Sequence, residues 1–285
     1  MTDQVCTTST SVGLIAGGGV LPFAVADSLL ARNITPTLFA LKGFCDPAAV
    51  GRFRHHWISL GQFGRLKRLL RAEHCRDLVF IGSLVRPSIA QVRLDWGTVR
   101  VLSGIVAALR GGDDHLLSGV GRIFEREGFR LLGIRDVAPD LLMPQGSLTR
   151  TTPDPGQLAD IAKARAVLLA LSPFDIGQGA VVIDDHVVAV EDIGGTDALL
   201  ETVARLRAKG AIQAKPRRGV LVKAPKSGQD LRFDLPALGP RTIEGVAAAG
   251  LAGIAVVAGN TVVAESQTMI EAADRAGLFV VGLAT

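Results

Sequence analysis

The feature that most constrains this sequence is a short apolar run that ends in consecutive glycines and is followed by a helical pattern. Residues 12–16 predict a buried strand, and residues 17–19, all glycine, predict a tight turn. Residues 21–32 have helical periodicity, with Pro22 suited to the first turn. A second apolar strand follows at residues 36–41. This βαβ opening favours a parallel sheet covered by helices.

The same alternation continues through the first half of the chain. The predicted strands lie at residues 57–60, 78–82 and 129–132, and the predicted helices at residues 63–73, 103–110 and 116–127. Pro and Gly then gather among Ser and Thr in residues 143–156, which predict a linker. We therefore expect an N-terminal Rossmann-like parallel-sheet domain over residues 1–142.

The second half also alternates, with mixed strand directions. Helices are predicted at residues 157–171, 198–209, 242–249 and 266–276, and strands at residues 180–183, 187–190, 219–223, 253–258, 261–264 and 278–281. Asp184-Asp185 and Gly259-Asn260 each separate two strands and predict hairpin turns. We expect a C-terminal mixed α/β catalytic domain over residues 157–285.

The composition limits the class of ligand. Hydrophobic residues make up 48% and charged residues 20% of the chain, which is typical of a globular protein. The net charge of +4 fits an anionic ligand or an anionic lipid surface. Aromatic residues are only 5% and tyrosine is absent, so the chain lacks the stacking platforms of nucleic-acid-binding proteins. No nucleic-acid partner is expected.

The cysteines and the apolar runs indicate the compartment. Cys6, Cys45 and Cys75 are far apart, without metal-ligand spacing, which favours a reduced compartment. The first eleven residues lack the pattern of a signal peptide, and every apolar run is too short to span a membrane. We expect a cytoplasmic protein.

The glycine turn at residues 17–19 is the first candidate site. The helix that follows offers unpaired N–H groups and a positive dipole end to a phosphate. The dinucleotide fingerprint is not met, because Pro22 stands in place of its last glycine and no acidic residue ends the strand at residues 36–41. Phosphate or sugar contact is favoured over a purely structural turn, and NAD is not expected.

Two further glycine-rich segments are candidates. Asp113 and Asp114, after Gly111-Gly112, could cap a helix, accept sugar hydroxyls or hold a hard cation, and these interpretations stay open. Residues 175–179 and residues 194–197 place glycines beside polar residues, which allows close backbone approach to a ligand. For Asp197 alone, a helix N-cap is the favoured interpretation.

The densest constellation begins with Lys223, at the end of a predicted strand. Lys223, Lys226 and Arg232 could neutralise phosphate oxygens, while Asp230 or Asp234 ligates a cation or positions water. Arg232 and Asp234 alternate with apolar residues, so in an extended segment both would face one side. A solvated charge run is the alternative. The sequence shows no histidine pair with metal spacing, no nucleophile elbow and no P-loop.

The order of these motifs resembles a known family, the metal-dependent UDP-2,3-diacylglucosamine pyrophosphatases of lipid A biosynthesis. The resemblance is to the α-proteobacterial type, not the calcineurin-like enzymes, and covers nearly the whole chain from residue 12. It is carried by residues 13–22, 61–64, 82–87, 112–114, 175–179, 195–197 and 223–239.

The resemblance implies hydrolysis of the substrate to 2,3-diacylglucosamine 1-phosphate (lipid X) and UMP. It also implies Mg²⁺ dependence, attack by water on the phosphorus nearer the sugar, and an active-site cleft, filled by lipid, between the two domains. Asp234 matches the aspartate of the family's R-x-D-x-P segment, which is needed for catalysis. One departure is Gly194, where the family usually has Glu, and Glu191 or Asp192 could take over that role.

We accordingly expect Asp234 to be the main catalytic residue and a metal ligand, supported by Asp230. The residues expected to bind substrate are Gly17, Gly18, Gly19, Gly82, Asp113, Asp114, Gln178, Gly195, Thr196, Asp197, Lys223, Lys226, Gln229 and Arg232. The expected partners are the lipid-linked UDP-sugar, the inner membrane as a peripheral contact, and a second copy of the chain in a homodimer. The rival classes are a non-catalytic protein that binds a nucleotide sugar or phospholipid, and a Rossmann-type oxidoreductase.

Overall fold

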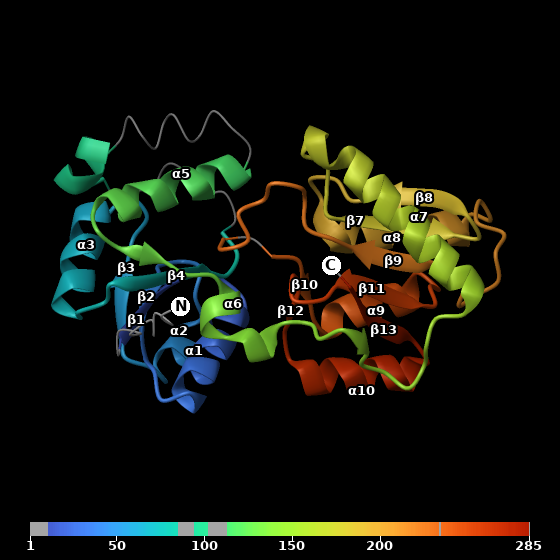
Figure 1. Cartoon of the computed structure of the whole chain (residues 1–285), viewed down its shortest axis with the longest axis horizontal. Helices are drawn as coiled ribbons and strands as arrows, with labels where there is room; N and C mark the ends of the chain where they lie inside the picture. The colour runs from blue at the N-terminus through green and yellow to red at the C-terminus, as the bar shows by residue number, and fades with distance from the viewer. Residues whose placement is uncertain (1–10, 85–93, 102–112, 234, 285) are drawn as a thin grey trace, which may run out of the picture. The chain divides into compact units, whose positions relative to one another are not determined.

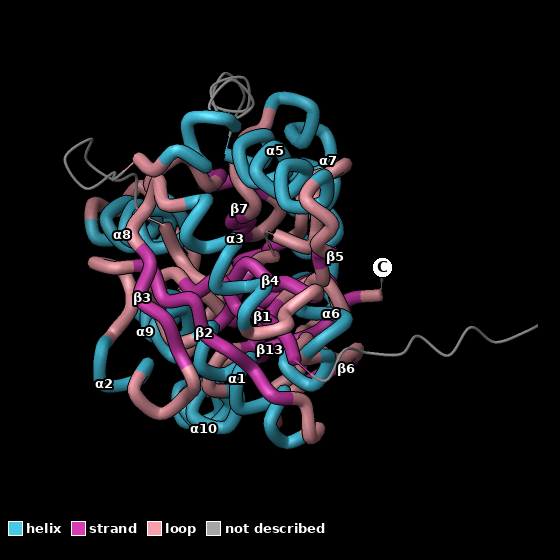
Figure 2. The backbone as a smooth tube through the Cα atoms, turned by 90° about the vertical axis from the view of Figure 1, so that its left-hand side faces the viewer, coloured by secondary structure: helices cyan, strands magenta, loops and turns pink. Residues whose placement is uncertain are grey.

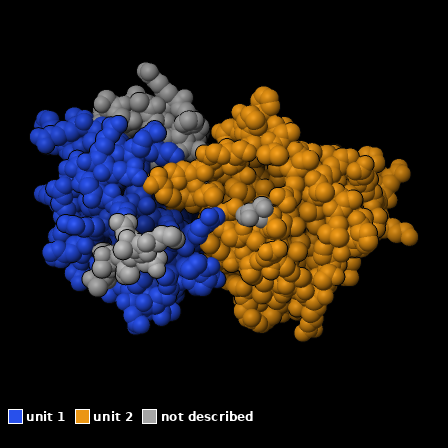
Figure 3. Space-filling view, in the orientation of Figure 1, with its two compact units in different colours: residues 1–140 blue, residues 141–285 orange. Residues whose placement is uncertain are grey.

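The chain folds into two α/β units. The computed structural model describes residues 11–84, 94–101, 113–233 and 235–284. Backbone contacts divide it into Met1–Asp140 and Leu141–Thr285, coloured separately in Figure 3. The predicted α/β class is confirmed for both units, while the helix predicted at residues 103–110 lies outside the described residues. No helix in the described ranges is both long and apolar enough to cross a bilayer.

The first unit is built on a parallel sheet. Its five strands have the order β3-β2-β1-β4-β5, and all four pairings are parallel. The strands are β1 (Ser11–Ala16), β2 (Thr35–Leu41), β3 (His55–Ile58), β4 (Asp77–Ile81) and β5 (Arg130–Leu131). The chain reverses its direction of progress between β1 and β4. In doubly wound sheets, ligands bind at the carboxyl ends of the strands at such a point.

Helices cover both faces of this sheet, which explains the uninterrupted apolar sequence of its central strands. The helices are α1 (Leu21–Ala31), α2 (Pro47–Val50), α3 (Phe63–Ala72), α5 (Asp113–Arg126) and α6 (Ile134–Val137). Phe124 of α5 contacts Phe63 of α3 and Phe80 of β4, with ring centroids 5.0 and 5.3 Å apart. On the other face, Arg32 after α1 donates to the Val137 carbonyl of α6 at 2.6 Å. Figure 1 shows α3 with α5, and α1 with α6, on opposite sides of the sheet.

The second unit is built on a mixed sheet of order β6-β13-β11-β9-β7-β8. Its strands are β6 (Gly146–Ser147), β7 (Gly179–Ile183), β8 (His186–Val190), β9 (Val220–Lys223), β11 (Gly253–Val257) and β13 (Phe279–Leu283). In this sheet β11 pairs parallel with β9 and β13, and the other pairings are antiparallel. A separate parallel pair joins β10 (Ala237–Leu238) to β12 (Val262–Val263).

Alternate residues of the second sheet fill two separate cores. The helices are α7 (Pro155–Leu171), α8 (Gly195–Ala208), α9 (Pro240–Ala248) and α10 (Ser266–Ala276). Ala180 and Val182 of β7 pack toward Leu168 of α7, while Val181 and Ile183 pack with the residues of α8, α9 and α10. This period of two is what a strand buried on both faces requires. The tube in Figure 2 shows the strands and helices from a second direction.

The structure contradicts one local expectation for the second unit, and it shows where the segment expected to be a linker lies. The hairpin predicted around Gly259-Asn260 is wrong: β11 pairs with β9 and β13, while β12 pairs with β10. A fully buried central strand must satisfy both edges, and a two-residue hairpin partner would occupy one of them. The segment predicted as a linker, residues 143–156, lies in the second unit and contains β6. Met143 in this segment is buried in the larger core.

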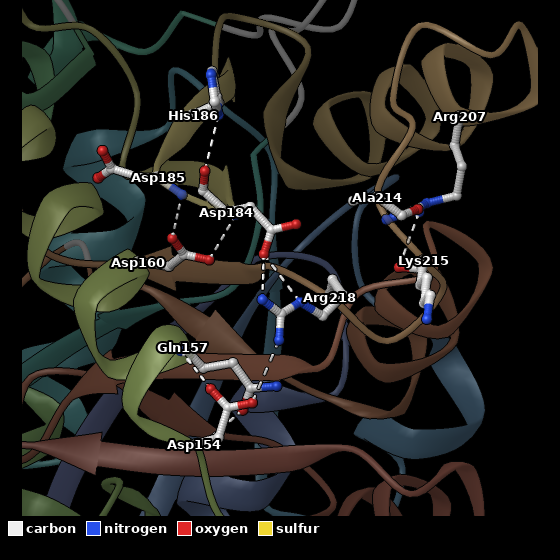
Figure 4. A network of polar contacts seen from close by, with 10 residues as sticks. All are labelled: Asp154, Gln157, Asp160, Asp184, Asp185, His186, Arg207, Ala214, Lys215 and Arg218. Carbon is white, nitrogen blue, oxygen red and sulfur yellow. Dashed lines mark hydrogen bonds and ion pairs between the residues drawn. The ribbon is translucent and has the colours of Figure 1, made fainter.

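The hairpin predicted at Asp184-Asp185 is confirmed, and a helix holds it in place (Figure 4). Both residues have positive φ, at 48° and 67°, as the tight turn requires. The buried Asp160 carboxylate of α7 accepts their N–H groups at 3.0 and 2.7 Å. Arg218 binds the Asp184 carboxylate at 2.6 Å and reaches Asp154, the N-cap of α7, at 3.7 Å. The turn is thereby tied to the start of the helix.

We predict that Asp160→Asn lowers the free energy of unfolding by about 1–3 kcal/mol, because the amide nitrogen would face a backbone donor. Urea unfolding followed by circular dichroism measures this change. The matched control is Asp27→Asn, which removes an exposed pair with Arg52 and should change stability by less than about 1 kcal/mol. Equal effects of the two substitutions would contradict the role given to Asp160.

Candidate active site

A buried lysine stands at the carboxyl end of β9. Lys223 is only 7% exposed, and its Nζ donates to the Thr196 hydroxyl at 2.8 Å and to the Ala237 carbonyl at 3.4 Å. The Thr196 hydroxyl lies 2.9 Å from Glu191 Oε2, to which it donates. An ammonium, a hydroxyl and a carboxylate thus form one chain of hydrogen bonds. Lys223 and Thr196 were expected at the site, and Glu191 completes the chain.

Two glycines make room for Glu191. A Cβ on Gly177 would lie 2.0 Å from the Glu191 carbonyl oxygen, and one on Gly179 would lie 2.6 Å from its Oε2. Gly177 also has a φ of 45°, where glycine is favoured. The glycine spacing that suggested close approach to a ligand therefore serves, at these positions, close approach to Glu191.

The segment after β9 forms a turn at residues 231–233, so the extended arrangement considered for Arg232 is not found in the described residues. The Asp230 carboxylate accepts the Arg232 backbone N–H at 3.1 Å, and the Phe233 N–H donates to the Asp230 carbonyl at 3.0 Å. A short acidic side chain stabilises such a turn by bonding two residues ahead. The Arg232 guanidinium also binds Asp230, at 2.8 Å. This hydrogen bond lowers the pKa of Asp230, which keeps the carboxylate ionised.

The remaining residues of this segment are held by their neighbours. The Lys226 ammonium pairs with Asp175 at 2.5 Å. The backbone N–H of Lys226 donates to Gln229 Oε1 at 2.9 Å. The Gln178 carbonyl accepts the N–H of Ala224 at 2.9 Å. Lys226, Gln229 and Gln178 therefore gather around the end of β9, as expected, together with Asp175.

A cavity of about 240 Å³ opens beside this segment. It is lined mainly by apolar side chains of α7, such as Leu168 and Leu169, and by Ala224 and Pro225. Val257, the last residue of β11, also contributes. The cavity therefore lies at the carboxyl ends of parallel strands, where α/β sheets bind ligands. It can accept an apolar group, and Arg165 is the cationic residue among those that line it.

In the first unit, two N–H groups of the glycine turn already form hydrogen bonds with the protein backbone. The N–H groups of Gly17 and Gly18 donate to the carbonyls of Ile81 and Ser83, each at 2.8 Å. A Cβ on Gly82 would lie 2.7 Å from the Gly18 carbonyl oxygen, so this approach needs glycine. Contact with a phosphate through the Gly17 and Gly18 N–H groups is therefore not available in this arrangement.

The start of α1 remains open. Gly19 has a φ of 90° and is exposed, and an added Cβ would meet nothing within 4 Å. The N–H groups of Gly19, Val20 and Leu21 form no hydrogen bond within the part of the chain that is described. A helix start with unpaired N–H groups suits an anion. The N–H groups of this turn that could still contact a phosphate are therefore those of residues 19–21.

Four acidic residues expected at the site either lie outside the described part, wholly or in their side chains, or differ from the expectation. Asp234 lies outside the described residues. Asp113 and Asp114 occupy the first turn of α5, and their side chains lie outside the described part. Asp197 is not the N-cap, since α8 begins at Gly195, and it pairs with Arg241 at 2.8 Å.

Gly194, where the family usually has Glu, lies in a crowded position. A Cβ there would lie 2.8 Å from the Ala198 Cβ, so any side chain would require a shift. Asp192 accepts the Gly194 N–H at 2.8 Å, whereas Glu191 reaches Thr196. Of the two acidic residues considered as replacements, Glu191 is the one directed at the Lys223 chain.

The described part of the chain contains two buried cysteines and no cluster of metal-ligating side chains. No group of three or more His, Cys, Asp or Glu side chains within the described ranges could hold a metal ion. Burial raises the pKa of the Cys45 and Cys75 thiols, so they are poor nucleophiles.

The fold defines a two-unit α/β protein in which several cations gather near the carboxyl end of β9. Models of the LpxI N-terminal domain and the LpxI C-terminal domain match residues 11–141 and 144–281. The chain is 42% identical over 272 residues to the UDP-2,3-diacylglucosamine pyrophosphatase LpxI of Caulobacter vibrioides. The match covers 95% of this chain and 97% of that protein. The chain belongs to the LpxI family, which confirms the family that the motifs indicated.

We predict that Thr196→Val lowers the free energy of unfolding by about 1–3 kcal/mol, because the part-buried Glu191 and the buried Lys223 each lose a partner. Thr196→Ser keeps the hydroxyl and should stay within about 0.5 kcal/mol of the wild type. Urea unfolding of the second unit, monitored by circular dichroism, separates the two variants. If valine and serine had equal effects, the hydroxyl would not be the link between Lys223 and Glu191.

Proposed function

We propose that this chain hydrolyses the pyrophosphate bond of UDP-2,3-diacylglucosamine to 2,3-diacylglucosamine 1-phosphate and UMP. The main support is its 42% identity, over nearly the full length of both chains, to a protein named for that activity. The second unit has both a buried, hydrogen-bonded ammonium and a mainly apolar cavity, and these two features are compatible with a substrate that combines phosphates and acyl chains.

The reaction requires stabilisation of charge on phosphoryl oxygens. A water oxygen bonds to one phosphorus while the bridging P–O bond breaks, and UMP leaves with the bridging oxygen when attack occurs on the sugar side. Lys223 is suited to these oxygens because Thr196 and Ala237 already orient its ammonium. An oriented charge needs little reorganisation as the transition state forms. Lys226 and Arg232 would add positive charge near the end of β9.

We also propose that hydrolysis depends on Mg²⁺ or another divalent cation, as the family resemblance implies. The described carboxylates do not form such a site by themselves. Each is already engaged: Asp230 with Arg232, Asp175 with Lys226, Glu191 with Thr196, and Asp197 with Arg241. Asp234 is the ligand that the family resemblance implies, and Asp113 and Asp114 stay candidates.

Other parts of the expectation stay proposals. We place the protein in the cytoplasm, in peripheral contact with the inner membrane, and as a homodimer. The strand order β3-β2-β1-β4-β5 supports a Rossmann-like classification of the first unit. The cleft between the domains remains a prediction of the sequence.

We predict that Lys223→Met lowers kcat/KM about 100-fold or more, because the oriented ammonium is lost from the phosphoryl oxygens. UMP release from UDP-2,3-diacylglucosamine dispersed in neutral detergent measures the effect. Lys209→Met, at the exposed end of α8, is the matched control and should retain wild-type activity. Wild-type turnover in Lys223→Met would remove this lysine from the reaction.

We predict that Asp234→Ala retains the fold and binds substrate but loses most turnover, since the main catalytic carboxylate is removed. The assay compares UMP release with and without EDTA, in ¹⁸O-labelled water. The wild type should stop with EDTA and place ¹⁸O in the lipid phosphate. Full activity of a folded Asp234→Ala variant would exclude Asp234. A wild type that binds substrate without releasing UMP would instead be a binding protein, and NAD(P) binding would favour an oxidoreductase.

A further inference from the structure

An exposed tryptophan marks one surface of the first unit. Trp96 is 85% exposed, and Val99 is 47% exposed. Residues 96–101 are helical, so Trp96, Val99 and the exposed Arg100 stand at i, i+3 and i+4 on one face. Leu94, 58% exposed, precedes them. We call these four residues the Trp96 face.

The turn that carries Trp96 is clamped to the start of α3. The Asp95 carboxylate accepts N–H groups of Gly64 at 3.1 Å, Arg65 at 2.8 Å and Thr98 at 2.8 Å. The Thr98 hydroxyl accepts the Phe63 N–H at 3.0 Å. Burial raises the pKa of Asp95, but these N–H donors outweigh it and lower the pKa overall. The carboxylate therefore stays ionised at the positive end of the helix.

Close backbone packing also fixes this turn. A Cβ on Gly97 would lie 2.4 Å from the Gly64 Cα, so the two backbones touch where no side chain fits. The exposure of Trp96 is therefore not the result of a loosely packed segment. The fold holds a large apolar side chain in water at a fixed position.

The helix beneath this turn is strongly basic. Helix α3 contains four cationic residues and no acidic residue. Lys67 and Arg71 face Glu127, at 3.0 and 3.6 Å. Arg65 and Arg68, three residues apart, are exposed and form no ion pair with any described residue. Arg65, whose backbone N–H binds Asp95, lies next to this turn, and Arg68 follows three residues further along α3.

We infer that the Trp96 face, with Arg65 and Arg68, docks on an anionic lipid bilayer. Tryptophan favours the membrane–water interface, where its ring is buried while its N–H stays hydrated. Arginines beside it are attracted to anionic head groups. Apolar Leu94 and Val99 favour a bilayer over a nucleic acid. The inference builds on the proposed function, because a diacyl lipid substrate resides in a bilayer.

The experiment uses the full chain and two kinds of vesicle. One kind contains phosphatidylethanolamine and phosphatidylglycerol, and the other contains phosphatidylcholine alone. The wild type should float with the anionic vesicles, and in a Trp57→Phe background the Trp96 emission should shift to the blue. Trp96→Ser should weaken partitioning about tenfold or more. Arg65→Gln and Arg68→Gln should each weaken it about fivefold.

Two exposed residues of the second unit provide matched controls. Phe174→Ser removes an aromatic side chain that is 71% exposed, and Arg205→Gln removes an exposed cation of α8. Both variants should partition like the wild type. Equal losses in these controls, or no shift of Trp96 emission, would overturn the inference. So would a change from dimer to monomer on Trp96→Ser, measured by light scattering, because the face would then join two copies.

The same variants separate this inference from the proposed function. Trp96→Ser should hydrolyse detergent-dispersed substrate at the wild-type rate but act more slowly on substrate embedded in anionic vesicles. A wild type that is inactive on dispersed substrate would contradict the proposed function, whatever its vesicle binding. A wild type that is active on dispersed substrate without binding vesicles would contradict only the docking surface.

Discussion

A buried ammonium must be surrounded by hydrogen-bond acceptors. In the second unit, the buried Lys223 meets this requirement. The acceptors come from distant parts of the chain: Thr196 at the start of α8 and Ala237 in β10. Glu191 holds the threonine, and two glycines make space for Glu191. The arrangement leaves a positive charge oriented at the carboxyl end of β9. The proposed phosphate chemistry would depend on that charge.

The first unit meets a different constraint, the close approach of the ends of β1 and β4. Gly17, Gly18 and Gly82 let the two backbones bond directly. The glycines that first suggested phosphate binding are thus mostly structural. Their structural role places the open N-terminus of α1 at the point where the strand order reverses. Each sheet therefore presents a feature that favours anions at the carboxyl ends of its parallel strands.

A substrate with two phosphates and two acyl chains makes two demands on the protein. The phosphates require oriented positive charge, which we propose that Lys223 provides. The acyl chains keep the substrate at a membrane, where a clamped tryptophan beside exposed arginines is suited to dock. Cationic side chains are thus proposed to serve two purposes, phosphate binding and membrane docking. Lys223 is buried and oriented, whereas Arg65 and Arg68 are exposed.

Local patterns in the sequence were sufficient for the βαβ opening, the α/β class and the turn at Asp184-Asp185, because periodicity and turn chemistry act over a few residues. They failed at Gly259-Asn260, where the buried strand β11 pairs with β9 and β13 instead. They also did not show that the Asp230 carboxylate bonds to its own turn. Local pattern also could not show that Glu191, rather than Asp192, reaches Thr196. The sequence by itself determined which segments become strands and helices and which residues can carry charge. Only the tertiary structure decided which carboxylate meets which cation, because those contacts join residues that are distant in sequence and leave no short-range pattern.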